Sequence, residues 1–176
     1  RRFYRNWIMK TMTTKSSVPA ALFLVVLSLA GCYTVGVVPP DGVHRVFIPI
    51  FQNDTFPYER GLEDELTLAL REKLEIQTPC ILAPTAASAD AVIEGTISRF
   101  RERVRAEDRL DRAVRSSATV AVEVVFRRTG ERPEIFFKDN ISERVAFRTS
   151  AGVDNAKKEM VRRVTDKIIA RMTRWD

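Results

Sequence analysis

The chain has 176 residues, with 29 lysines and arginines against 23 aspartates and glutamates and a pI near 9.7. A basic balance of this kind is typical of nucleic-acid-binding proteins. A single histidine excludes a histidine-rich zinc site, and the chain's two cysteines exclude a framework of several disulfides.

The N-terminal 31 residues have the pattern of a bacterial lipoprotein signal peptide. They carry five basic residues and no acidic one, and an apolar stretch follows from Ala20 to Ala30. This stretch is shorter than the roughly 20 apolar residues that a transmembrane helix needs. The run that ends it, Leu29–Cys32, resembles a lipobox, so we expect cleavage before Cys32 and attachment of diacylglycerol and an N-acyl chain to this cysteine. The alternative is an ordinary leader that ends near a cysteine, and residues 1–8 precede the first methionine, as an over-extended start would.

Removal of the leader changes the charge argument. All five charges before Cys32 are positive, so residues 32–176 keep 24 basic against 23 acidic residues, a net charge of +1. Nucleic-acid binding thereby loses its main support, and the 145 remaining residues suffice for one ordinary domain. If Cys32 is lipidated, Cys80 has no disulfide partner, and we predict a buried, inert thiol there rather than a reactive one.

The first half of the expected domain contains one strand and one helix. Residues 32–42 are small, apolar and proline-rich, which predicts a lipidated tether before a domain over residues 43–176. Alternation over Val43–Phe51 predicts a strand with both faces covered. Leucines at helical spacing predict a helix over Glu59–Ile76, whose early acids suit the helix dipole.

The second half is expected to contain three consecutive strands and a closing helix. The strands are predicted over Ala91–Val104, Ser117–Arg127 and Ile135–Phe147, and the last two form a hairpin. The helix is predicted from Asp154, as N-cap, to Met172. The order β, α, β, β, β, α predicts an α+β two-layer sandwich, with a four-stranded, mainly antiparallel sheet and two helices packed on one face.

The sequence offers little support for catalysis. His44 is the only histidine, it begins a strand, and neither a GxSxG nor an HExxH motif is present. The acids Glu63, Asp64 and Glu65 are adjacent in a helix, so they point in different directions and are explained as a solvated first turn.

Arginines recur with a period of two at Arg99, Arg101, Arg103 and Arg105, at the end of the first of the three strands, and Arg109 follows them. We expect the row on the face that carries Ile93 and Ile97 further back, where it could bind phosphates. The alternative is a solvated strand end, neutralised by neighbouring acids at Glu102, Glu107, Asp108 and Asp111.

Several segments resemble the LptE family, the lipoproteins that partner the outer-membrane β-barrel LptD in lipopolysaccharide assembly. They are the block Val46–Phe51, the positions Asn53, Thr55 and Phe56, the helix GLEDELTLALREKL from Gly61 to Leu74, and the strand start Ala89–Ile97. With the lipobox they span most of the mature chain.

The resemblance implies a non-enzymatic domain that sits in or against the barrel lumen, plugs it, helps it to fold and contacts lipopolysaccharide. Basic residues near strand ends are associated with lipopolysaccharide binding in the family, which makes the arginine row a candidate glycolipid site. Tyr33 follows the cysteine where an Asp would mark inner-membrane retention, so the expected location is the inner leaflet of the outer membrane, on the periplasmic side. We expect no nucleic acid, no metal and no cofactor beyond the acyl chains.

Two other classes remain open. A lipoprotein that activates or scaffolds another envelope machine, like the LpoB and CsgG group, also opens with a strand and a leucine-rich helix, but its strands and helices usually alternate. A lipid-anchored hydrolase would need a deep pocket that gathers His44 with carboxylates.

Overall fold

The computed structural model describes residues 38–107, 113–130, 133–148 and 152–172, without the side chains of residues 104–107 and 113–115. The described elements, in chain order, are the strands β1 (Arg45–Phe47) and β2 (Gln52–Asn53), helix α2 (Leu62–Gln77), strand β3 (Ile81–Leu82), the short 3-10 helix η1 (Ala86–Ser88), the strands β4 (Ala91–Glu107), β5 (Ala113–Arg128) and β6 (Ile135–Arg148), and helix α3 (Gly152–Arg171).

The sheet has six strands and mixed pairing. Its order is β3-β1-β4-β5-β6, and β2 pairs separately with β4. The short strands β1, β2 and β3 make only parallel pairs, whereas β4 with β5 and β5 with β6 are antiparallel. The succession of three long strands is therefore confirmed, but the four-stranded sheet that we expected is wrong in its strand number.

Two local features account for the difference. The single strand expected over Val43–Phe51 is interrupted after Phe47, and pairing resumes only at Gln52. Pro49 lies in the gap, where its missing N–H prevents a continuous ladder. The sequence also gave no signal for β3, whose two residues pair with β1 beside the longer strands.

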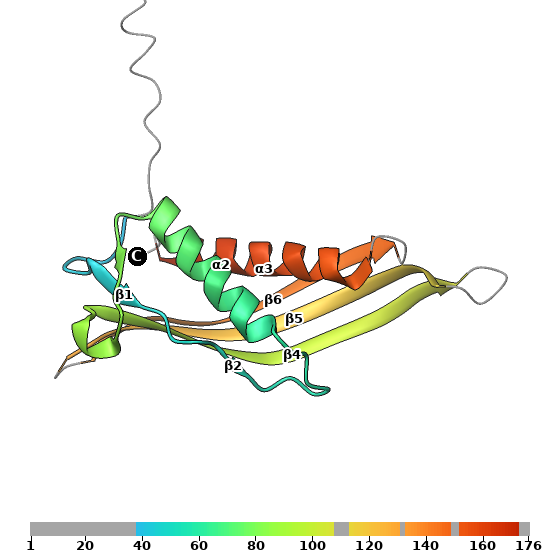
Figure 1. Ribbon diagram of the computed structural model, residues 1–176, viewed down its shortest axis with the longest axis horizontal. Helices are drawn as coiled ribbons and strands as arrows, with labels where there is room; N and C mark the ends of the chain where they lie inside the picture. Colours follow the sequence, from blue (N-terminus) through green and yellow to red (C-terminus); the bar gives the residue numbers. More distant parts are fainter. Residues whose placement is uncertain (1–37, 108–112, 131–132, 149–151, 173–176) are drawn as a thin grey trace, which may run out of the picture. The chain divides into compact units, whose positions relative to one another are not determined.

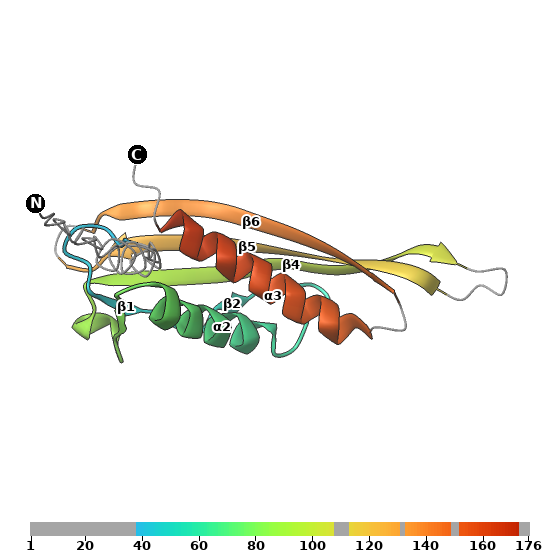
Figure 2. The same ribbon diagram turned by 90° about the horizontal axis from the view of Figure 1, so that it is seen from above.

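Both helices pack on one face of the sheet, as predicted (Figure 1, and Figure 2 from above). They begin at Leu62 and Gly152 rather than at Glu59 and Asp154, so Asp154 lies in the first turn of α3 and is not its N-cap. No helix in the described ranges combines the length and the apolar character needed to cross a membrane.

The core forms where the predicted helix stripes meet the sheet. The buried stripe of α2 is Leu62, Leu66, Leu70 and Leu74, and that of α3 is Ala156, Met160, Val164 and Ile168. They face the inward side of β5, where Ala118, Val120, Val122, Val124 and Phe126 are 0–1% exposed. Burial of each large aliphatic side chain contributes about 1.5–3 kcal/mol, so these stripes fix the layer order.

Gly95 leaves room for the ring of Phe51 in this core, and we expect Gly95→Ala to destabilise the domain. An ideal Cβ at Gly95 would lie 2.2 Å from the ring of Phe51, whose side chain is only 2% exposed. The ring would have to move within a filled core, which costs about 1–3 kcal/mol. Urea unfolding measures this loss, and Thr96→Ala on the opposite face is the control expected to change stability little. Equal stability of Gly95→Ala and the wild type would contradict the packing described here.

Candidate anion-binding face

Strand β4 changes the face on which its side chains lie at a β-bulge. Ile97 pairs with Val122, and the next paired residue, Arg99, lies opposite Ala121, so Ser98 is an extra residue. Ser98 and Arg99 are both exposed, and Phe100 returns to the core at 8% exposure. The bulge thus shifts the alternation by one residue. The expectation that the arginine row shares a face with Ile93 and Ile97 is wrong.

The described arginines of this row lie on the outer face of the sheet, away from the helices. Arg99, Arg101 and Arg103 are exposed and alternate with Phe100, which has Lys157 of α3 5.6 Å from its ring centroid on the inner side. Glu102 lies opposite the buried Ala118 in the β4–β5 register, and so it occupies the helix side of the sheet.

The expectation that Glu102 neutralises the row is therefore wrong, because the Glu102 side chain and the arginine side chains lie on opposite faces of the sheet. The side chain of Glu107 is outside the described set, and Asp108 and Asp111 lie outside the described residues.

Strand β6 adds two arginines that sequence reasoning missed. Arg101 pairs with Thr119 of β5, and Thr119 pairs in turn with Arg144 of β6. The Nε of Arg144 donates a hydrogen bond to Thr119 Oγ1 at 3.2 Å. Arg148 lies four residues further along β6, on the same face. The alternating pattern of β6 could have indicated that Arg144 and Arg148 share a face. Only the pairing of β4, β5 and β6 shows that this face also carries the arginines of β4.

We call this surface the basic face and define it as Arg99, Arg101, Arg103, Arg144 and Arg148. Among the described residues, no salt bridge joins these five side chains to a carboxylate. The next acids along the outer face are already paired, Glu123 with Lys138 and Glu94 with Arg127, both at 2.7 Å. Within the described ranges, the basic face is therefore a cluster of positive charge without a paired carboxylate.

This arrangement suits an extended anion with more than one phosphate. Alternate residues of a strand are about 6.5–7 Å apart, and neighbouring strands are about 4.8 Å apart. Guanidinium groups on such a grid can each bind a phosphate bidentately, and the rigid sheet behind them limits the entropy lost on binding. The backbone of Arg105 continues β4 without a described side chain, and Arg109 and Cys32 lie outside the described residues.

His44, the candidate for a catalytic residue, contributes its backbone to a structural contact. His44 is exposed, and its backbone N–H donates to Asp90 Oδ2 at 3.0 Å, as does that of Arg45 at 2.7 Å. The N–H groups of Arg45 and His44 hold the pKa of Asp90 below its ordinary value. Asp90 thus ties β1 to the start of β4 through the backbone of His44 and not through its imidazole.

Cys80 is buried, and burial raises the pKa of its thiol, as expected for an inert cysteine. Within the described ranges, no three His, Cys, Asp or Glu residues are grouped so that they could hold a metal ion.

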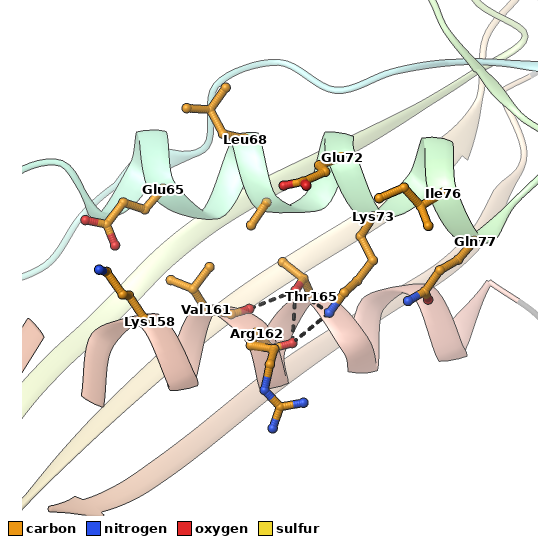
Figure 3. Close-up of a pocket in the computed structure, with 11 residues that line it drawn as sticks. Glu65, Leu68, Glu72, Lys73, Ile76, Gln77, Lys158, Val161, Arg162 and Thr165 are labelled. Atoms are coloured by element: carbon orange, nitrogen blue, oxygen red, sulfur yellow. Dashed lines mark hydrogen bonds between the residues drawn. The ribbon is translucent and has the colours of Figure 1, made fainter. Parts of the chain in front are cut away.

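A groove of about 600 Å³ lies between α2 and α3 (Figure 3). Lys73 reaches across it from α2 and donates to Thr165 Oγ1 at 3.2 Å and to Asp166 Oδ1 at 2.5 Å. Glu65 and Glu72 line the α2 side, whereas the basic residues of the other wall, Lys158 and Arg162, come from α3. Because its charges are mixed, the groove does not select an anion, and the basic face is the stronger candidate site.

Comparisons with known proteins place the fold in a family. The family model described as LptE, lipopolysaccharide-assembly, matches residues 43–172. The hypothetical protein CT253 from Chlamydia trachomatis is similar with a TM-score of 0.54 and 13% identity, over 76% of this chain and 98% of that one. Protein XCC0632 from Xanthomonas campestris gives 0.56 and 12%, over 80% and 91% of the two chains. No curated protein sequence matches the chain. The two similar structures show the fold alone, and the match to the family model shows the family.

Proposed function

The chain belongs to the LptE lipopolysaccharide-assembly family, and from this premise we propose that it is a lipid-anchored component of the outer-membrane machinery for lipopolysaccharide. In this proposal the domain plugs and supports a β-barrel of the LptD type and contacts lipopolysaccharide on its way to the outer leaflet. The role is non-enzymatic, because the domain contributes a folded plug and a charged surface rather than a reactive group.

The observation that carries the glycolipid contact is the basic face. It presents five exposed arginines, on β4 and β6, that are unpaired with carboxylates among the described residues. Lipid A carries phosphates, and bidentate Arg–phosphate pairs are among the stronger hydrogen bonds available to a protein. A ligand that spans two or more of these arginines would gain both affinity and orientation.

The lipid on Cys32 would keep the domain beside its partner. Each buried methylene contributes about 0.8 kcal/mol, and stable anchoring takes more than one acyl chain. Diacylglycerol together with an N-acyl chain meets that requirement. The residue after the cysteine, Tyr33, fits delivery to the inner leaflet of the outer membrane on the periplasmic side.

Co-purification tests this role, because the function lies in the partner. The full chain with a C-terminal tag, extracted from its own envelope in mild detergent, is expected to bring with it an outer-membrane β-barrel identified by mass spectrometry. A peptidoglycan synthase in place of the barrel would instead favour an activator of the LpoB and CsgG kind.

A further inference from the structure

The loop between β2 and α2 presents an aromatic side chain almost wholly to solvent. Phe56 is 94% exposed, and Tyr58, two residues later, is 58% exposed. Pro57 between them is exposed as well. In Figure 1 this connection extends beyond the sheet, at the lower edge of the view. An exposed phenylalanine alone is ordinary in a folded protein, but this one is carried by a loop with many internal hydrogen bonds.

Hydrogen bonds fix the loop on both sides of Phe56. Asn53 Nδ2 donates to the carbonyl oxygen of Glu59 at 2.8 Å and to Glu63 Oε2 at 2.6 Å. Thr55 is 6% exposed; its Oγ1 donates to Asn53 Oδ1 at 2.7 Å and accepts from the N–H of Glu59 at 2.9 Å. The two ends of the loop are therefore clamped together beneath Phe56.

Further contacts tie the clamp to both helices. Tyr58 OH donates to Glu63 Oε1 at 2.7 Å, and Glu59 forms an ion pair with Lys157 of α3. Burial raises the pKa of Glu63, but hydrogen bonds from its own N–H, Tyr58 and Asn53 outweigh this and lower it. Glu63 thus stays charged and holds the loop, which corrects the expectation that all three acids of the first turn are simply solvated.

A loop fixed in this way has already lost the conformational entropy that binding would otherwise cost. An aromatic side chain presented by a fixed backbone is a common kind of anchor in protein interfaces. The polar side chains of the loop bond to one another, whereas Phe56 and Pro57 are apolar and exposed. The loop is therefore built to present a small apolar anchor.

The charge around the anchor defines the surface that it fits. Asp54 is exposed in the loop and Asp64 in the first turn of α2, and Arg60 is the exposed cation of the same segment. A surface of anionic lipid headgroups would be repelled by these carboxylates. An apolar pocket with a basic rim would be attracted to them, because it buries the ring and pairs the acids.

We propose that Phe56 is a docking anchor that inserts into an apolar, basic-rimmed pocket of the β-barrel partner. The inference rests on the proposed function, which supplies the barrel, and adds the surface by which this domain is held. The loop follows β2, which pairs with β4 at Thr96 and Ile97, immediately before the basic face begins. Docking at Phe56 would therefore bring the barrel wall to one end of that face.

Photocrosslinking in the native envelope tests the anchor. With p-benzoylphenylalanine in place of Phe56, irradiation is expected to join the full, tagged chain to the barrel. Phe56→Ser is expected to lower barrel recovery at least about tenfold, as for an interface hot spot. Ile81→Ser is the matched control, since Ile81 is 66% exposed on the short edge strand β3, and it is expected to leave recovery unchanged.

The outcomes separate the anchor from the proposed function. If the wild type recovers the barrel but position 56 gives no adduct with it, or gives adducts only with lipid, the anchor is wrong and the role stands. Unchanged recovery with Phe56→Ser, at unchanged urea stability, overturns the anchor in the same way. Absence of any barrel with the wild type overturns both.

Discussion

Replacing Arg101, Arg103 and Arg144 together with serine is expected to weaken binding to lipopolysaccharide vesicles at least about tenfold, or about 1.4 kcal/mol. The three side chains belong to two strands, and β5 brings them onto one exposed surface. Their removal deletes charge-assisted phosphate contacts, so the remaining binding should also depend less on salt. Co-sedimentation of the purified domain with vesicles at several salt concentrations measures both effects.

A variant with the same change in charge separates this site from general electrostatic attraction. Arg60, Lys158 and Arg163 are also exposed but lie in the β2–α2 loop and on α3. Their joint replacement with serine is expected to leave binding near the wild-type value. If both triple variants bind alike, the basic face is not the glycolipid site, and the family assignment is unaffected.

Cys32→Ser is expected to remove the protein from the outer-membrane fraction. The substitution removes the thiol that would receive diacylglycerol, and with it the methylenes that contribute about 0.8 kcal/mol each to membrane binding. Fractionation of cells followed by immunoblotting against the C-terminal tag measures the distribution. The expected change is from recovery mainly in the outer membrane to little or none there.

The second cysteine provides the control for that experiment. Cys80→Ser removes a buried thiol from the folded domain and is expected to leave the protein on the membrane. If Cys32→Ser remains in the outer-membrane fraction after a salt wash, the lipobox interpretation of residues 29–32 is wrong.

The parts of the fold that depend on periodic burial could be predicted from the sequence. Leu62 to Leu74 on α2 and Ala156 to Ile168 on α3 repeat at helical spacing, and both stripes are buried. The alternation along β5 correctly identified its inward face. These predictions succeeded because burial of one face requires apolar residues at the period of the helix or strand, and this pattern is visible in the sequence.

The features that depend on register could not be predicted. Nothing in the sequence marks Ser98 as the extra residue of a bulge, yet that one residue moves Arg99, Arg101 and Arg103 to the opposite face. The approach of Arg144 to the row likewise requires the pairing of three strands. A shift of one residue reverses every side chain that follows it, so a site on a strand is less predictable than the strand.

The loop that carries Phe56 illustrates a different limit. Asn53, Thr55 and Phe56 could be noted as shared family positions, but their roles depend on where Glu59 and Glu63 lie after the chain has turned. Hydrogen bonds between residues a few positions apart leave no periodic pattern. Only the folded loop distinguishes the residues that clamp it from the residue that it presents.

The central claim is that the domain acts as the partner of an outer-membrane β-barrel in lipopolysaccharide assembly, and quantitative co-purification tests it most directly. The tagged full chain should be isolated from purified outer membranes in mild detergent, beside a parallel preparation of Cys32→Ser as the unanchored control. The account predicts that one barrel protein is recovered with the wild type in near-equal amount and is depleted with the control. Recovery of the intact wild-type protein from the outer membrane with no barrel would contradict it.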